Sequence, residues 1–209
     1  MRKTTAALLL AVSLAGCAAP ADPAPVSSAP APEIPPVSAE HMRSALVESA
    51  ARPLSESEIL DAYHQAQRVY GWFDLAPLPT SGETVRENGA VFYRVDMDGI
   101  EELEDLRAYL RGVFSQELAE ALLGGEASRI RYQDIGGALY FSGSSRDREN
   151  GKGAVHVEAE QLEETAYSVN VMVDLLAEDG ETVVGLESWS FPYAFSEGRW
   201  VFTDFQLVY

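Results

Sequence analysis

The chain has few of the residues that most often carry out chemistry. Its 209 residues include one cysteine and three histidines. A single cysteine excludes an intramolecular disulfide and any metal site built from several thiolates. Long apolar runs are also missing, because residues 4–14 are shorter than the roughly 20 residues of a membrane-spanning helix. Basic residues are scarce: 15 Lys and Arg face 33 Asp and Glu, a net charge of −18 that disfavours nucleic acid as a partner.

The first residues predict export. A basic Met1-Arg2-Lys3 start, a short apolar centre and small residues before Cys17 are typical of a secretory signal peptide over residues 1–16. Leu14-Ala15-Gly16-Cys17 resembles the lipobox of bacterial lipoproteins. The resemblance implies that Cys17 is acylated, begins the mature protein and anchors it to the extracytoplasmic face of a bacterial cell membrane. The alternative is an ordinary secreted protein with one unpaired thiol.

Residues 17–38 form the next segment and consist largely of Ala, Pro and Ser. This composition predicts an extended tether without a core. The remaining residues, 39–209, are expected to form a single domain. Cleavage before Cys17 removes two of the 15 basic residues and none of the 33 acidic ones, so the net charge changes from −18 to −20. This charge favours a basic partner, although an acidic surface also serves solubility alone.

Several segments of the domain have helical spacing. Ser55 and Glu58 form a capping box, and the helix that follows is expected to end near Phe73, before two prolines. A second helix is expected from Asp98 and a third from Ser115. A short helix is also expected over residues 39–51. The apolar positions at helical spacing are Ile59, Tyr63, Ala66, Tyr70 and Phe73 in the first, Leu103, Leu106, Leu110, Val113 and Phe114 in the second, and Leu118, Leu122 and Leu123 in the third.

Alternation with a period of two predicts strands in the rest of the domain. Tyr167 to Leu175 alternates most clearly, and Pro192 within a later strand predicts an edge or a bulge. The expected strands are residues 90–95, 130–132, 138–141, 155–162, 167–176, 182–195 and 199–209, with a polar loop over 142–153. Helices followed by an antiparallel meander indicate an α+β fold. We expect N-terminal helices packed on a curved antiparallel β-sheet, as in cystatin-like or cone-shaped folds.

The histidines do not match a known catalytic pattern. His41 lies near the tether, and His64 is one position off the apolar stripe of its helix. His156-Val157-Glu158 is similar to the start of a deaminase zinc motif, but the chain lacks the cysteines that this motif needs. No nucleophile elbow, Ser-x-x-Lys or His-Glu-x-x-His sequence occurs. We therefore expect a protein that is not an enzyme.

Two further segments resemble ligand loops and fail at later positions. Asp96-Met97-Asp98-Gly99 begins like a calcium loop, but Ile100 and Arg107 occupy positions five and twelve. Gly151-Lys152 lacks the earlier glycine and the following Ser or Thr of a phosphate-binding loop. The sequence therefore predicts no metal and no cofactor. Most aromatic residues alternate at strand spacing and are expected in the core, while those on the opposite face could line a groove for a ligand or partner.

Six short segments keep a common order over residues 58–209: Tyr-Gly-Trp-Phe-Asp at 70–74, Phe-Tyr-Arg-Val at 92–95, Leu-Arg-Ala-Tyr-Leu at 106–110, Val-Phe-Ser at 113–115, Gly-Ala-Leu-Tyr at 137–140 and Gly-Arg-Trp-Val-Phe-Thr at 198–203. Together they resemble the IseA family of DL-endopeptidase inhibitors. The resemblance implies an extracellular protein that binds and blocks NlpC-type cysteine endopeptidases, which cut peptidoglycan stem peptides.

Inhibition in that family is attributed to a projecting loop between two strands. The matching segment is the loop over 142–153, so the resemblance implies that Arg146, Asp147, Arg148, Glu149 and Asn150 contact a cell-wall hydrolase. The lipobox adds a membrane-side location, and we expect a monomer. Two alternatives remain open: a lipoprotein that binds a small ligand or the cell envelope through a cystatin-like pocket, and an envelope scaffolding subunit that acts by contact.

Overall fold

The computed structural model describes residues 52–125, 128–147 and 151–208, all of which belong to the compact unit Val37–Tyr209. Cys17, the signal peptide, the tether and the helix expected over 39–51 lie outside the described residues. The helices are α2 (Glu56–Gly71), α3 (Leu103–Arg111) and α4 (Gln116–Gly124). The strands are β1 (Thr80–Glu87), β2 (Ala90–Val95), β3 (Ile130–Ile135), β4 (Ala138–Gly143), β5 (Lys152–Glu163), β6 (Ala166–Leu176), β7 (Val183–Ser196) and β8 (Arg199–Phe202).

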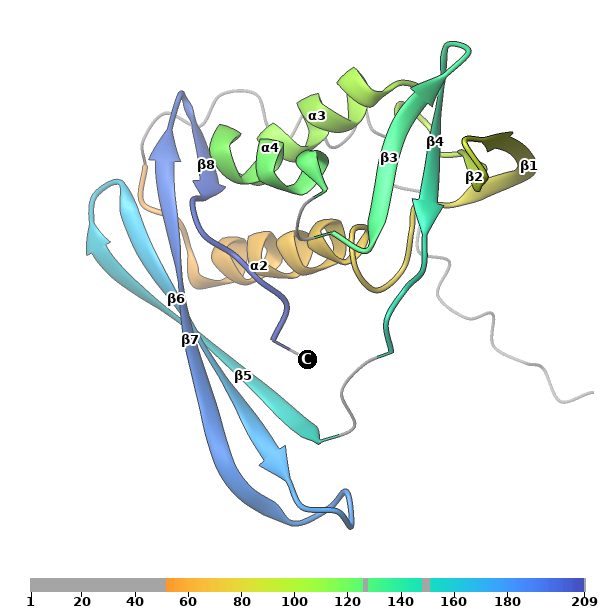
Figure 1. Cartoon of the computed structure of the whole chain (residues 1–209). Coiled ribbons are helices and arrows are strands. Elements are labelled where there is room, and N and C mark those ends of the chain that lie inside the picture. Colours follow the sequence, from red (N-terminus) through yellow and green to blue (C-terminus); the bar gives the residue numbers. More distant parts are fainter. Residues whose placement is uncertain (1–51, 126–127, 148–150, 209) are drawn as a thin grey trace, which may run out of the picture. The chain divides into compact units, whose positions relative to one another are not determined.

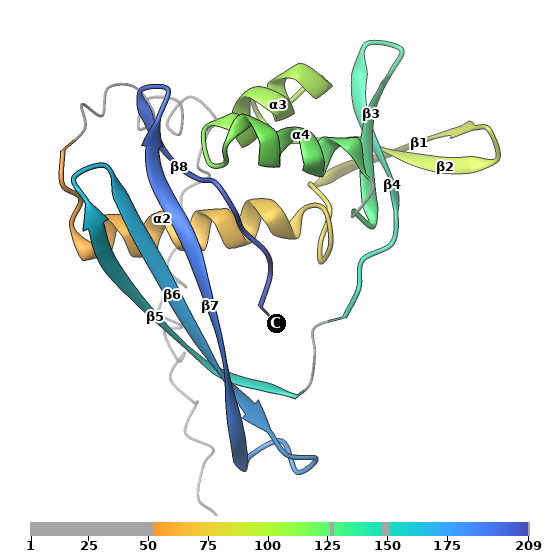
Figure 2. The same ribbon diagram turned by 60° about the vertical axis from the view of Figure 1, so that its left-hand side comes forward.

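The predicted α+β fold is confirmed (Figure 1). Along the chain, helices α2, α3 and α4 all precede β3 and the strands that follow it. The strands divide into two antiparallel four-stranded sheets, ordered β1-β2-β4-β3 and β5-β6-β7-β8. Helix α2 lies against the inner face of the second sheet (Figure 2). No helix in the described part of the chain is long and apolar enough to span a membrane.

Helix α2 begins as predicted. Ser55 accepts a hydrogen bond from the backbone N–H of Glu58, and the Glu58 carboxylate accepts one from the backbone of Ser55. The buried positions recur at helical spacing: Ile59, Tyr63, Ala66 and Val69. This stripe packs against the sheet, where the rings of Tyr63 and Phe191 lie 6.3 Å apart.

One face of the sheet β5-β6-β7-β8 is buried because apolar residues occupy every second position of β6. Tyr167, Val169, Val171 and Val173 in β6 are all buried, and the residues between them are half-buried. The register is continuous from Tyr167 opposite Tyr193 to Leu175 opposite Gly185. The outer strand β5 exposes mostly polar side chains.

The start of α3 corrects the sequence prediction. Asp98 was expected to begin this helix, but residues 96–100 form a turn, and the helix begins at Leu103. The Leu103 N–H donates to Oδ1 of Asp134 at 2.7 Å, and Oδ2 of Asp105 accepts from the N–H groups of residues 101 and 102. Because these carboxylates satisfy the first N–H groups, Asp98 has no role as a cap.

The chain after β8 also differs from prediction. The strand expected over residues 199–209 ends at Phe202, because Thr203 makes the last backbone bond to β7 and Phe205 then turns into the core. The Phe205 ring lies within 6 Å of five aromatic rings: Tyr63, Tyr70, Phe114, Phe191 and Phe202. The aromatic residues near the C-terminal end of the domain are therefore mainly core residues, as predicted.

Candidate functional site

The predicted partner-binding loop lies between β4 and β5 and joins the two sheets (Figures 1 and 2). It is shorter than the expected 142–153, because β4 continues through Gly143 and β5 begins at Lys152. Asp147 is exposed. Arg148, Glu149 and Asn150 lie outside the described residues.

Arg146 is bound to the body of the protein. Its backbone N–H donates to the carbonyl of Asp74 at 2.9 Å, and its Nε lies 2.5 Å from Oδ2 of the same residue. About four fifths of each of the two side chains is buried. Arg146 is one of the residues predicted to contact a partner, and within the chain it makes this anchoring contact with Asp74.

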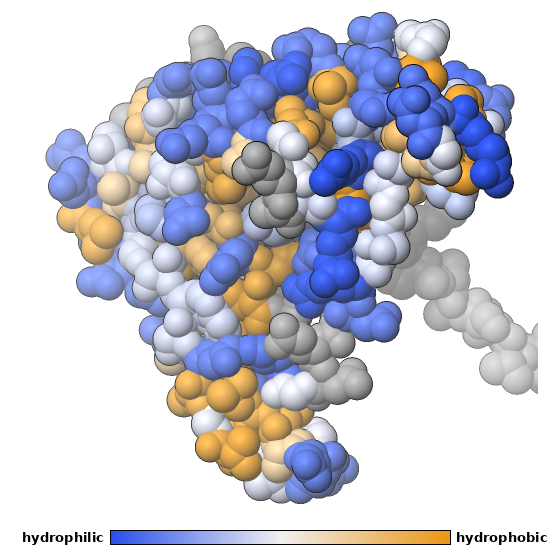
Figure 3. All heavy atoms as spheres, in the orientation of Figure 1, coloured by the Kyte–Doolittle hydropathy of each residue, from blue (hydrophilic) through white to orange (hydrophobic). Residues whose placement is uncertain are grey.

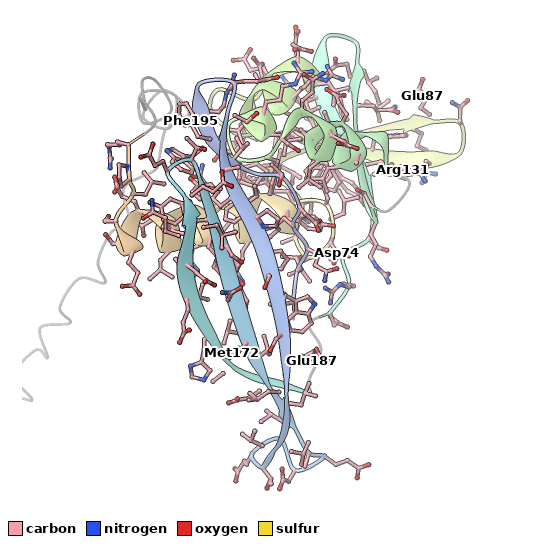
Figure 4. All side chains as sticks on the ribbon, turned by 90° about the vertical axis from the view of Figure 1, so that its left-hand side faces the viewer. Asp74, Glu87, Arg131, Met172, Glu187 and Phe195 are labelled. Atoms are coloured by element: carbon pink, nitrogen blue, oxygen red, sulfur yellow. The ribbon has the colours of Figure 1, made fainter. Side chains whose placement is uncertain are left out.

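Asp74 was not singled out from the sequence, although it ends the segment Tyr-Gly-Trp-Phe-Asp. The turn that follows α2 is tight, since Leu75 and Ala76 both donate to the carbonyl of Gly71. Asp74 also lies 3.4 Å from Nε of Arg129, measured from its Oδ1. The carboxylate of Asp74, which is labelled in Figure 4, therefore connects the end of α2 to the segments on either side of the β3–β4 hairpin.

The other end of the connection is fixed as well. Lys152 forms an ion pair with Glu187 on β7, and its Nζ lies 5.1 Å from the centre of the Trp189 ring. The backbone N–H of Leu176 donates to the carbonyl of Gly151 at 2.9 Å. One end of the connection is therefore bound to the turn after α2, and the other is bound to β6 and β7.

A surface cleft of about 610 Å³ lies beside the end of α2. Its lining is largely apolar and contains no carboxylate: His64, Gln67, Arg68, Gly71, Trp72, Leu75, Ala76, Pro77 and Pro79. Nδ1 of His64 lies 3.1 Å from Oε1 of Gln67, and the rings of Trp72 and Tyr109 lie 5.3 Å apart. On a chain with net charge −18, the exposed Arg68 makes this cleft suitable for an apolar ligand that carries a negative charge.

The calcium-like segment lines a second, polar cleft of about 410 Å³, which includes Asp96, Asp98 and Glu101. Within residues 52–125, 128–147 and 151–208, no group of three or more His, Cys, Asp or Glu side chains is arranged to hold a metal ion. His156 is exposed on β5 and lies opposite Met172, which is labelled in Figure 4, whereas His64 lies on α2. His41 lies outside the described residues.

The backbone around the cleft depends on a buried hydroxyl. Tyr132 on β3 donates to the carbonyl of Trp72 at 2.9 Å and accepts from the N–H of Leu78 at 3.0 Å. Burial raises the pKa of Tyr132 well above its ordinary value. This residue therefore holds the start and the end of the segment that lines the cleft.

Comparison of the chain with protein-family models gives no match, and comparison with curated proteins gives none either.

Proposed function

We propose that this protein is a lipid-anchored, extracytoplasmic inhibitor of NlpC-type DL-endopeptidases. The observation that carries the proposal is the double anchoring of the β4–β5 connection, by Arg146 on Asp74 and by Lys152 on Glu187. A loop with fixed ends loses less conformational entropy on binding than a free one, so it suits insertion into the cleft of an enzyme. The six segments that resemble the IseA family support the same function.

Charge supports a protein partner of opposite sign. The chain carries 33 acidic residues against 15 basic ones. An acidic body accelerates the approach of a basic hydrolase and discourages acidic partners. Asp147 is exposed at the anchored end of the connection and is available for contact.

A turnover assay tests this function directly. The purified full-length chain is mixed in micromolar excess with several NlpC-type hydrolases, and release of peptidoglycan fragments is measured. We expect slower release with the wild-type chain and partial recovery with Asp147→Asn or Glu149→Gln. Glu117→Gln on α4 removes an exposed acid elsewhere and is expected to inhibit like the wild type. Unchanged hydrolysis with every enzyme would rule out the proposal.

The lipid anchor has a separate test. Cells that express the chain are grown with radiolabelled palmitate, and label is expected in the wild-type protein and not in Cys17→Ser. The variant is also expected in the soluble fraction. Label in Cys17→Ser, or its absence from the wild type, would contradict the anchor without affecting the inhibition assay.

A second candidate function is the binding of a small ligand, and the carboxylate-free cleft near Arg68 favours it. Anilinonaphthalene sulfonate joins an aromatic body to a negative charge, and its fluorescence rises in an apolar site. We expect saturable binding that weakens in Arg68→Gln and is retained in Arg129→Gln, an exposed arginine outside the cleft. Equal binding by both variants would exclude this cleft as the site.

A further inference from the structure

Strand β7 is much longer than its neighbour β8. The pairing with β8 covers only Tyr193 to Ser196, whereas β7 begins at Val183. Residues 183–191 therefore pair with β6 on one side, and no other strand formed by the described residues lies on the other side (Figure 2). We call residues 183–191 the open edge of β7.

The direction of the backbone groups on this edge follows from Pro192. Its carbonyl accepts from the N–H of Thr203, so residue 192 faces the β8 side. Backbone groups in an antiparallel strand point to alternate sides, so Ser190, Ser188 and Leu186 face the same side. Among the described residues, no backbone bond from outside the sheet reaches these three. The open edge thus presents unpaired N–H and C=O groups at regular spacing.

The side chains near the open edge are unusually apolar for an exposed strand. Val183, Val184 and Leu186 are 52%, 65% and 60% exposed. Figure 3 shows hydrophobic side chains gathered at this end of the sheet. The opposite edge strand, β5, also exposes Val155 and Leu162, but between them it exposes His156 and Glu158, polar side chains of the kind that protect an edge from pairing. The open edge of β7 lacks that protection.

Charge around the open edge limits what can bind there. The adjoining turn carries the exposed acids Glu178, Asp179 and Glu181, and Asp174 lies opposite Leu186. Hydrogen bonds from the side chain and backbone of Thr182 lower the pKa of Asp179 to about 2. An anionic membrane or a second copy of this acidic chain would be repelled, and a segment rich in lysine or arginine would be attracted.

We propose that the open edge of β7 at Leu186 to Ser190 binds an extended, basic segment of a protein partner by strand addition. The partner's backbone pairs with the groups of Leu186, Ser188 and Ser190, its apolar side chains pack on Val184 and Leu186, and its basic side chains face the acids of the turn. The open edge also carries Glu187, which pairs with Lys152 at the end of the β4–β5 connection, but the proposed strand addition uses other groups of β7 and does not depend on the proposed inhibition.

Ser188 offers a matched pair of variants. Its N–H faces away from β6, so Ser188→Pro removes a donor from the open edge and leaves the β6–β7 pairing intact, as Pro192 does in the native chain. Ser188→Thr keeps the donor and favours the strand. Leu186→Ser removes apolar contact without changing the backbone. Circular dichroism checks that each variant is folded.

The probe is the labelled peptide Lys-Val-Lys-Val-Lys-Val-Lys, titrated with the full-length chain and followed by fluorescence anisotropy. We expect saturable binding, with affinity lowered about tenfold by Ser188→Pro and reduced by Leu186→Ser, and unchanged in Ser188→Thr. The analogue with glutamate in place of lysine, and the backbone N-methylated peptide, are expected to bind far more weakly.

Four results would overturn the proposal. They are equal affinity of Ser188→Pro and Ser188→Thr, equal binding of the acidic peptide, no saturable binding at millimolar peptide, and retained binding of the N-methylated peptide. Sedimentation of the chain alone provides a fifth. A dimer that Ser188→Pro dissociates would identify a second copy as the occupant of this edge and would also contradict the proposal.

Discussion

The Nε atom of Arg146 lies 2.5 Å from Oδ2 of Asp74, although the two residues are 72 positions apart in the chain. The ion pair is mostly buried and is reinforced by the bond from the Arg146 N–H to the Asp74 carbonyl. It connects the predicted inhibitory loop to the end of the helix that supports the second sheet.

Replacement of Arg146 tests this connection. Arg146→Ala is expected to lower the free energy of unfolding by about 1–2 kcal/mol, because it removes a charge-assisted hydrogen bond from a mostly buried carboxylate. Urea denaturation measures the change. Arg129→Ala is the control, since Arg129 is more than half exposed and lies farther from Asp74. An equal loss in both variants would show that Arg146 has no special anchoring role.

The hydroxyl of Tyr132 is expected to contribute to the stability of the fold. Tyr132→Phe leaves the N–H of Leu78 and the carbonyl of Trp72 without their partner, at a cost of about 1–3 kcal/mol in the free energy of unfolding. Tyr140→Phe is a matched control, because Tyr140 is also buried and its hydroxyl has no hydrogen bond to a described residue. A change below about 0.5 kcal/mol is expected there. Chemical denaturation distinguishes the two.

The lowered pKa of Glu58 predicts that the free energy of unfolding depends on pH in the acid range. Its hydrogen bond from Arg52, with further bonds from Ser55, lowers the pKa of Glu58 from 4.5 to about 2. Because the folded-state pKa is lowered, ionised Glu58 stabilises the fold above about pH 4.5, and this contribution is lost as the pH falls toward 2. The difference in unfolding free energy between the wild type and Glu58→Gln should therefore shrink over this range.

Urea unfolding at several pH values checks this prediction. Glu56→Gln removes another acid from the first turn of α2 and serves as the control. It is expected to show a smaller difference from the wild type, since Glu56 is not part of the capping box. A constant gap between wild type and Glu58→Gln from pH 7 to pH 2 would contradict the assigned role.

The two candidate caps of α3 can be separated by mutation. Asp134→Ala removes the acceptor of the Leu103 N–H and is expected to destabilise the protein by about 1 kcal/mol. Asp98→Ala should change stability by less than about 0.5 kcal/mol, because Asp98 lies in the preceding turn. Thermal unfolding measures both. The reverse order would restore Asp98 as the cap.

Features encoded by neighbouring residues could be predicted. The capping box of α2 involves only Ser55 and Glu58, which are three positions apart. The alternation of apolar and polar residues in β6 indicates a strand with one buried face. The turn between β3 and β4 contains Gly136 and Gly137, both with positive φ, so its sequence is typical of a two-residue hairpin. These signals fix the class of the fold and most element boundaries.

Features that depend on residues far apart in the chain could not be predicted from the sequence. Asp134 caps a helix that begins 31 positions earlier, and nothing near Leu103 reveals it. Strand β1 left no periodic signal, because nearly all of its residues are exposed. The division into two sheets is hidden for the same reason, since the spacing of strands does not state which ones pair.

The candidate site could also be predicted from the sequence only in part. The loop between β4 and β5 could be located from its polar composition, but the Asp74 contact of Arg146 arises only when the end of α2 meets that loop. The cleft near Arg68 combines residues of α2 with prolines that had been noted only as helix breakers. Their shared surface is a product of the turn at residues 71–76.

Phe205 has a consequence for the order of events during synthesis. All five of its ring neighbours precede it in the chain, so their common packing cannot be completed until residue 205 has left the ribosome. A nascent chain that stops short of residue 205 lacks the ring that all five of these aromatic side chains contact. Under the export proposed for this protein, such late closure would leave the polypeptide incompletely packed while it passes through a translocation channel.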